Sequence, residues 1–161
     1  MKVFLLGDKK IGKSDLLCAW SKTDIHPYYS PTIGVDFKGR GTIHAWDGAG
    51  GRPYSSIVET YIQGCENFII AYKWGDLNSM KSVMGYWMPM IKHHVPVPNV
   101  SIVRCQIDLD VECPDPELER QLHQLGYKVF ETSSITKEGI HELFEQFKED
   151  ETSGQEEETF F

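Results

Sequence analysis

The chain has 161 residues, four cysteines and a formal net charge of −8 at pH 7. This length suits one domain with a proper core, and the acidic balance argues against a general nucleic-acid binder. No apolar run approaches the roughly 20 residues that a membrane span needs, and the first run is too short for a signal peptide. The cysteine spacing indicates neither a metal nor a redox site, so we expect free thiols and a cytoplasmic, reducing setting.

Short apolar runs alternate with helical patterns along the chain. In chain order, we predict a strand at Val3–Leu6, a helix at Asp15–Trp20, strands at Ile43–Trp46 and Phe68–Tyr72, a helix at Leu77–Lys92, a strand at Val100–Arg104, a helix at Pro116–Leu125, a strand at Lys128–Glu131 and a helix at Glu138–Phe147. Apolar strands separated by helices predict an α/β fold with a mainly parallel sheet flanked by helices on both faces. Residues 1–148 would form this domain, and the acidic stretch 149–161, which has no core pattern, is expected to be a disordered tail.

The most informative motif is the run Gly7-Asp8-Lys9-Lys10-Ile11-Gly12-Lys13-Ser14 between the first strand and the first helix. It fits the phosphate-binding loop pattern of glycine, four residues and then Gly-Lys-Ser. The glycines let backbone N–H groups turn toward a phosphate, and the helix N-terminus adds its dipole. Lys13 can reach the β- and γ-phosphates, and the Ser14 hydroxyl is a suitable Mg²⁺ ligand. A plain strand–helix turn would not need lysine and serine together, so the motif predicts nucleotide binding.

A second constellation is the stretch 31–37, followed by Trp46-Asp47-Gly48-Ala49-Gly50. A threonine on a flexible segment after the first helix, Thr32, can give Mg²⁺ a second hydroxyl. An aspartate at the end of a strand, Asp47, can contact Mg²⁺ through water, and the Gly50 N–H can meet the γ-phosphate. The two stretches together predict a magnesium–nucleotide site.

With these motifs the chain resembles a Ras-superfamily small GTPase over Met1 to about Phe147. The Thr-Ile-Gly-Val-Asp-Phe stretch at 32–37 resembles the Rab branch, and the stretch 57–64 has the Rab spacing from Trp46. The run Glu131-Thr132-Ser133-Ser134 resembles the family's guanine-binding loop. Any one motif could be an ordinary loop or sheet segment, but four stand in the family's order. The resemblance implies a P-loop NTPase fold that binds GTP or GDP with Mg²⁺, the metal being held by Ser14, Thr32 and Asp47.

The base-binding motif departs from the family pattern. The family's Asn-Lys-x-Asp stands here as Cys105-Gln106-Ile107-Asp108. Asp108 keeps the carboxylate that accepts two N–H bonds from guanine, beside Ser133 and Ser134. Cys105 cannot replace the asparagine bonds that tie the base loop to the phosphate loop in the family, and Gln106 keeps only a stem along the base. At about 1–2 kcal/mol per lost hydrogen bond, we expect guanine preference with affinity weakened about ten- to a thousandfold.

The positions that support hydrolysis in the family also differ. Gly51 stands where the family carries its catalytic glutamine, so no side chain orients the attacking water there. Arg52 follows where most relatives are acidic. Lys10 fills a phosphate-loop position reserved for glycine, where its side chain intrudes on the glutamine and an incoming arginine finger, although it could instead be an ordinary solvated lysine. We expect slow GTP hydrolysis, unless Arg52 or Lys10 acts as a cation within the chain.

The sheet edge and the chain end depart as well. The link from Phe37 to Trp46 is shorter than the family's hairpin, which predicts a shortened edge hairpin of two short strands and a tight turn. No cysteine near the C-terminus could accept a prenyl group, and anionic lipid would repel an acidic tail. We expect a monomer without a direct membrane anchor and without a nucleic-acid partner.

The Rab resemblance implies a protein-facing surface at Ile33, Phe37, Trp46 and Tyr61. The alternative is that the aromatic side chains of Phe37, Trp46 and Tyr61 only pack the core beneath the nucleotide-sensing segments. Three functions stay open at this point: a GTP-loaded, hydrolysis-impaired Rab-like protein that binds trafficking effectors or regulators, a working GTPase with an internal cation, and a pseudo-GTPase scaffold that binds no nucleotide.

Overall fold

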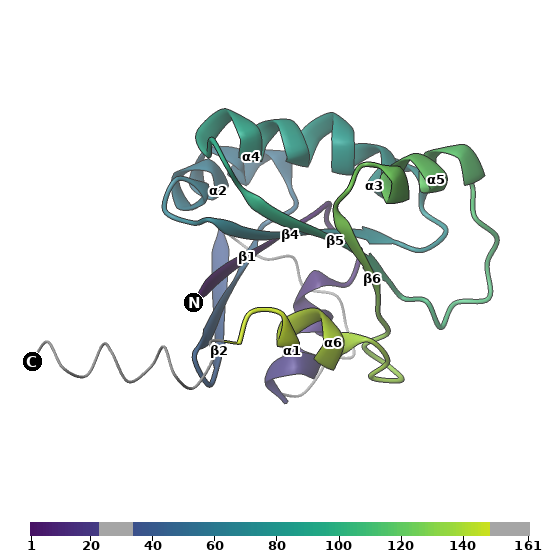
Figure 1. Ribbon diagram of the computed structural model, residues 1–161, viewed down its shortest axis with the longest axis horizontal. Coiled ribbons are helices and arrows are strands. Elements are labelled where there is room, and N and C mark those ends of the chain that lie inside the picture. The colour runs from purple at the N-terminus through teal and green to yellow at the C-terminus, as the bar shows by residue number, and fades with distance from the viewer. Residues whose placement is uncertain (23–33, 149–161) are drawn as a thin grey trace, which may run out of the picture.

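The computed structural model describes residues 1–22 and 34–148, and Figure 1 shows their arrangement. In chain order the elements are β1 (Lys2–Leu6), α1 (Lys13–Ser21), β2 (Val35–Arg40), β3 (Ile43–Gly48), η1 (Arg52–Tyr54), α2 (Ser55–Ile62), β4 (Asn67–Lys73), α3 (Leu77–Ser82), η2 (Val83–Trp87), α4 (Met88–His94), β5 (Asn99–Cys105), α5 (Pro116–Gln124), β6 (Lys128–Glu131) and α6 (Ile140–Glu145). Each strand and helix expected in chain order is present, with ends shifted by a few residues. Helix α2 was not expected.

The six strands form one sheet in the order β2-β3-β1-β4-β5-β6. All neighbours run parallel except β2 and β3, which pair antiparallel. This mainly parallel sheet confirms the predicted fold class. Strand β1 lies between β3 and β4 and runs parallel to both. The loop that follows β1 therefore lies beside the loops that follow β3 and β4, at the carboxyl edge of the sheet where ligands bind in open α/β folds.

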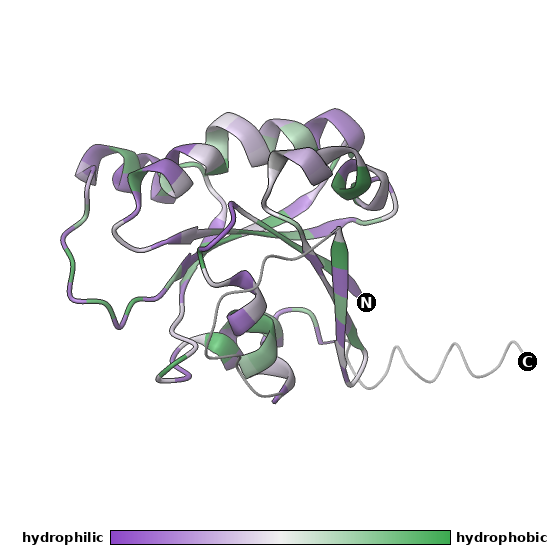
Figure 2. Ribbon diagram, turned by 180° about the vertical axis from the view of Figure 1, so that it is seen from behind, coloured by the Kyte–Doolittle hydropathy of each residue, from purple (hydrophilic) through white to green (hydrophobic). Residues whose placement is uncertain are grey.

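Helices cover both faces of the sheet, as Figure 1 shows. One face packs against α2, α3, η2, α4 and α5 through a cluster that includes Phe4, Phe68 and Trp87, and the opposite face packs against α1 and α6 through Leu5 and Phe144. Neighbouring side chains on a strand point to opposite faces, so a sheet covered on both sides needs strands that are apolar throughout. The central strands are accordingly mostly green in Figure 2.

The edge hairpin has the predicted tight turn, but its two strands have six residues each and are not short beside the other strands. Strands β2 and β3 are joined by Gly41 and Thr42 alone, and their register runs from Arg40 opposite Ile43 to Val35 opposite Gly48. Gly41 takes a left-handed conformation with φ 61°, which is the reason a glycine suits this turn.

The predicted helix at Leu77–Lys92 contains a π-helical segment. The path from Leu77 to His94 is continuously helical, but residues 83–87 form η2 before α4 begins. Pro89 in the first turn of α4 has no N–H for an i→i−4 bond, which accounts for a change of hydrogen-bond pattern here. In the part of the chain that the structure describes, no helix is both long and apolar enough to cross a membrane.

Candidate functional site

The phosphate-loop sequence forms a turn between β1 and α1. Gly12, just before the helix, is left-handed with φ 98°. Lys10 is left-handed too, with φ 65°, a conformation that costs an L residue about 1–2 kcal/mol. The surroundings must therefore hold the loop in a shape that its own residues do not prefer.

Lys13 lies beneath this loop and is only 7% exposed. Its ammonium Nζ donates to the Asp8 carbonyl at 2.7 Å, so the side chain folds back across the turn. Burial lowers the pKa of Lys13, while the nearby Asp47 carboxylate opposes that shift. The geometry supplies one fixed, poorly solvated cation beside the backbone of the loop.

Two oxygen donors meet at the start of α1. The Ser14 hydroxyl donates to Oδ2 of Asp47 at 2.5 Å, and Asp47 is 1% exposed near the end of β3. A hydroxyl and a carboxylate are the hard ligands that Mg²⁺ prefers, with phosphate oxygens and water completing its shell. The described residues hold no group of three or more His, Cys, Asp or Glu side chains that could bind a metal alone.

Gly50 brings the segment after β3 against the phosphate loop. A Cβ atom on this residue would lie 2.3 Å from the Lys9 backbone nitrogen and 2.7 Å from the Gly7 carbonyl oxygen, so only glycine fits. Gly51 follows, and its carbonyl accepts from the Tyr54 N–H at 3.1 Å as η1 begins. The segment predicted to sense a γ-phosphate therefore touches the predicted phosphate loop.

Other predicted residues contribute less to the described geometry. Lys9 and Lys10 are exposed on the loop, and Arg52 is the first residue of η1. Thr32 and Ile33, predicted for Mg²⁺ and for effector contact, lie outside the described residues.

Asp8 uses its carboxylate inside the protein. Oδ2 accepts from the Ser82 hydroxyl at 2.7 Å, and Oδ1 accepts from the Trp87 indole N–H at 2.9 Å. Asp8 thereby joins the phosphate loop to α3 and η2, and it offers the loop its backbone rather than its side chain. Sequence reasoning missed Ser82 and Trp87, because nothing near them along the chain indicates the loop they support.

The base loop is tied to the phosphate loop by Gln106. This residue is left-handed with φ 60°, and its amide Nε2 donates to the Ile11 carbonyl at 3.0 Å. Cys105 is buried, and burial raises the pKa of its thiol to about 12. The bond from the neighbouring Gln106 joins the two loops, a contact that the sequence analysis did not foresee.

Asp108 lies where the loops after β5 and β6 meet. The buried Ser133 hydroxyl donates to Oδ1 of Asp108 at 2.6 Å and accepts from the Thr136 N–H at 3.1 Å. The Ile107 N–H donates to the Thr132 carbonyl at 3.2 Å, which joins the same two loops through the backbone. These bonds hold the exposed Asp108 carboxylate, whose oxygens can accept from N–H groups.

Ile135 was missed by the sequence analysis. It follows Ser134 in the same loop and is 73% exposed. This exposed, branched apolar side chain lies two residues after Ser133, which bonds to Asp108. Its signal in the sequence is an isoleucine within a polar loop.

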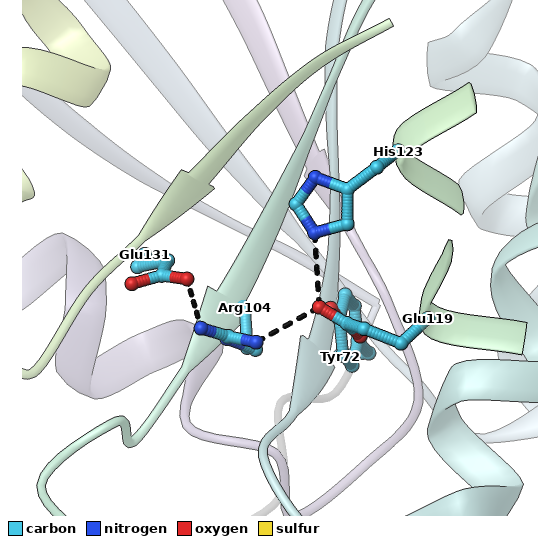
Figure 3. A network of polar contacts seen from close by, with 5 residues as sticks. All are labelled: Tyr72, Arg104, Glu119, His123 and Glu131. Carbon is cyan, nitrogen blue, oxygen red and sulfur yellow. Dashed lines mark hydrogen bonds and ion pairs between the residues drawn. The ribbon is translucent and has the colours of Figure 1, made fainter. Parts of the chain in front are cut away.

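A polar network supports both base loops from below (Figure 3). It joins three strands to α5 through Tyr72, Arg104, Glu119, His123 and Glu131. Arg104 donates to Oε1 of Glu119 at 2.8 Å and also pairs with Glu131. The Tyr72 hydroxyl donates to Oε2 of Glu119 at 2.6 Å, and the His123 ring lies 3.0 Å from Oε1.

Two members of this network lie at the start of the predicted base-binding motifs. Arg104 precedes Cys105, and Glu131 precedes Thr132. The Arg104 guanidinium also stacks 4.1 Å from the centre of the Trp74 ring. The network therefore fixes the ends of β5 and β6, from which the two predicted base loops start. In the sequence, the only indication of this network is an arginine near the end of the otherwise apolar β5.

The three aromatic residues predicted for effector contact form one row. Ring centroids of Phe37 and Trp46 are 4.9 Å apart, and those of Trp46 and Tyr61 are 5.6 Å apart. Phe37 is 44% and Tyr61 45% exposed, while Trp46 is half-buried and borders the core. Core packing therefore accounts for the partial burial of Trp46, but it does not account for the exposed rings of Phe37 and Tyr61.

Comparison with known proteins agrees with this geometry. Residues 2–153 match the Ras family. Relatives include the Ras-like GTP-binding protein RHO1 of Entamoeba histolytica, 26% identical over 91% of this chain and 74% of that protein. The Ras-related protein RABE1e of Arabidopsis thaliana is 28% identical over 89% and 71%, and Ras-related protein Rab-13 of Rattus norvegicus is 25% identical over 92% and 78%. The chain is a divergent member of the Ras family of GTP-binding proteins, with Rab-like relatives.

Proposed function

We propose that this protein binds GTP and GDP with Mg²⁺, hydrolyses GTP slowly, and in its GTP form binds effectors or regulators of Rab-type trafficking. The observation that carries the proposal is the meeting of three unlike groups around one loop. These are the buried Lys13 cation, the Ser14–Asp47 oxygen pair and, through Gln106, the Asp108 loop. A scaffold without a ligand gains nothing from a strained loop over a buried cation.

Phosphate binding would combine the loop backbone with Lys13. A phosphate beside the Lys13 ammonium replaces the solvation that burial removes, so the ligand gains a charge-assisted hydrogen bond. Magnesium would supply positive charge between the phosphate oxygens, held by Ser14 and, through water, by Asp47. Residues Thr32 and Gly50 complete the proposed phosphate and metal contacts.

Guanine would be selected by Asp108. A carboxylate accepts from two N–H groups of guanine, while adenine offers no matching pair of donors. The bond from Ser133 keeps one carboxylate oxygen in place, and Ser134 and Ile135 follow Ser133 in the same loop. A site that must hydrogen-bond its ligand rejects analogues that leave its groups unpaired.

Slow hydrolysis is proposed from Gly51. The chain lacks a side chain at the position that orients the attacking water, and a correct phosphate clamp cannot replace that function. Binding without chemistry keeps the GTP form populated. The exposed rings of Phe37 and Tyr61 beside Trp46, with Ile33, would then form a surface for a protein partner.

The decisive experiment identifies and titrates the nucleotide. The purified protein is denatured, and any released nucleotide is separated and identified. Fluorescent GDP is then titrated with and without EDTA, with GTP, XTP and ATP as competitors. Magnesium-dependent binding that only guanine nucleotides compete supports the proposal. An absence of bound nucleotide together with no titratable binding would make the chain a scaffold instead.

A further inference from the structure

A groove with a positive lining lies at the far end of α1 from the phosphate loop. It runs between α1, the β2–β3 turn and α6 as two adjoining cavities of about 480 and 410 Å³. Both cavities are lined by Trp20, Arg40 and His141. This surface takes no part in the proposed nucleotide site.

The first cavity is lined by basic and uncharged residues only. Its polar members are Lys22, Arg40, Lys137 and His141, and the remaining lining is Cys18, Ala19, Trp20 and Ile140. The chain as a whole carries a net charge of −8. A cavity with three permanent cations and no carboxylate is therefore an unusual concentration of positive charge for this protein, and it favours an anionic occupant.

The second cavity adds Lys148 and one acidic residue, Glu145. That carboxylate is already paired with Lys148 at 2.9 Å and with His141 at 3.3 Å. The floor is rigid, because Trp20 stacks on Phe144 with ring centroids 4.3 Å apart. Arg40 donates to the Trp20 carbonyl at 2.7 Å, which holds the β2–β3 turn against α1. The groove is thus preformed, so a ligand would not have to order it.

We propose that the acidic segment 149–161 of this chain occupies the groove. It carries no lysine or arginine, two phenylalanines at Phe160 and Phe161, and six carboxylates. The carboxylates are Glu149, Asp150, Glu151, Glu156, Glu157 and Glu158. This composition complements cations set among apolar side chains. The segment starts directly after Lys148, which itself lines the second cavity.

Chain length permits this docking. Thirteen residues, 149 to 161, reach up to about 40 Å when extended. The segment starts beside the second cavity, and that cavity shares Trp20, Arg40 and His141 with the first. A short tether raises the local concentration of the segment into the millimolar range, so weak pairs suffice. Exposed charge pairs are screened by salt, so docking must weaken as ionic strength rises. The docked segment would lie beside Lys22, from which the chain continues toward Thr32.

Zero-length carbodiimide cross-linking of the full chain tests the proposal, because it joins only carboxylates and amines that touch. The protein is treated at low micromolar concentration, and the monomer is digested and analysed by mass spectrometry. We expect links from segment 149–161 to Lys22 and Lys137, at least fivefold more abundant than links to the exposed Lys81 and Lys128. Half-molar salt should remove the difference.

A matched pair of variants separates docking from general charge effects. Arg40→Gln removes a groove cation without removing a cross-linkable amine, and Arg120→Gln does the same on the exposed face of α5. Links to Lys22 and Lys137 should fall at least threefold in Arg40→Gln and stay unchanged in Arg120→Gln. If Arg40→Gln does not fold, the triple variant Glu156→Gln, Glu157→Gln, Glu158→Gln replaces it, read out through Glu149–Glu151.

Three results would overturn the proposal. Cross-links spread evenly over all exposed lysines would mean that the segment has no preferred binding site on the domain. Links found only in a cross-linked dimer would assign the groove to the segment of a second copy. Cross-links from Lys22 and Lys137 to an added acidic peptide, with none to segment 149–161, would indicate that the groove binds a partner protein. None of these results bears on nucleotide binding, which is measured separately.

Discussion

The side-chain amide of Gln106 donates to the carbonyl of Ile11 at 3.0 Å, although 95 positions separate the two residues. The bond joins the loop after β5 to the phosphate loop. In the family an asparagine makes this connection, and the corresponding residue here, Cys105, is buried. The left-handed backbone of Gln106 lets the next residue along the chain take over the task. A degenerate motif has therefore kept its mechanical function.

Gln106→Ala should weaken GDP binding about two- to tenfold, which corresponds to one neutral hydrogen bond of about 0.5–1.5 kcal/mol. The dissociation rate of fluorescent GDP measures the effect. Gln121→Ala, at an exposed glutamine of α5, is the matched control and should change nothing. Adding Cys105→Asn to Gln106→Ala should restore part of the loss. An affinity indifferent to both substitutions would mean that the two loops bind independently.

Ser133→Ala should weaken GDP binding about ten- to a hundredfold, because the hydroxyl holds one oxygen of Asp108 at 2.6 Å and bonds to a charged group contribute about 1.5–3 kcal/mol. Asp108→Asn should instead change selectivity. An amide can donate to the 2-oxo group of xanthine, so competition between GTP and XTP should shift toward XTP. An unchanged ratio in Asp108→Asn would remove Asp108 from the base site.

Lys13→Met should abolish most phosphate affinity and yet stabilise the nucleotide-free protein near neutral pH. Burial lowers the folded-state pKa of Lys13, so between that pKa and its ordinary value of 10.5 the unfolded chain binds more protons, and the parent protein gains stability as pH rises. The stability difference between variant and parent should therefore be largest below the folded pKa and shrink as pH approaches 10.5. Urea unfolding between pH 7 and pH 10 measures it. A difference that is constant with pH would contradict a buried cation.

Lys10→Gly should raise the free energy of unfolding by about 0.5–1 kcal/mol, the relief of left-handed strain less the extra chain entropy of glycine. Lys9→Gly is the control, because Lys9 does not have a positive φ and its replacement should bring no gain. For a chain of this size the Lys10→Gly gain is a rise of about 1–4 °C in Tm. Equal shifts in both variants would point to lost charge repulsion instead of relieved strain.

Local signals made the phosphate loop predictable, whereas its supports were not. The strand before Gly7, the helix after Lys13 and the loop between them are read from adjacent residues. The bond from Trp87 to Asp8 crosses 79 positions, and no short pattern records such a partner. Helix α2 escaped notice for a related reason, since it fully buries only Val58 and Ile62 and leaves little apolar periodicity.

The base site was predicted in part. Asp108 and Ser133 were recognised from their motifs, and their contact confirms that the two motifs meet. The compensation by Gln106 could not be predicted, because it depends on a left-handed backbone that glutamine seldom adopts. Motif matching therefore identified the bonds that Cys105 cannot make but not the bond from Gln106 to the phosphate loop.

Intrinsic GTP hydrolysis should be very slow and should resist an arginine finger. Intact Ras-type enzymes turn over unaided at about 10⁻⁴ to 10⁻³ s⁻¹, and a finger accelerates them by roughly 10³–10⁵. At Gly51 no side chain is present to orient the attacking water. The exposed Lys10 side chain would obstruct the approach of an arginine finger to the phosphate loop. Both losses act on the transition state, so nucleotide can stay bound while the chemistry stalls.

Gly51→Gln tests this explanation by returning the missing amide. Gly51 does not have a positive φ. A Cβ there would meet the Tyr54 ring at 3.5 Å and Pro53 Cδ at 3.8 Å, both ordinary van der Waals contacts, so a glutamine can be accommodated. Single-turnover hydrolysis should rise toward the unaided Ras-type rate, while GTP affinity stays within about twofold. Gly51→Leu, similar in bulk without an amide, is the control and should not accelerate hydrolysis. A parent rate already above the Ras-type value that is lost in Arg52→Ala or Lys10→Ala would show the opposite, since the catalytic charge would then come from a cation within the chain.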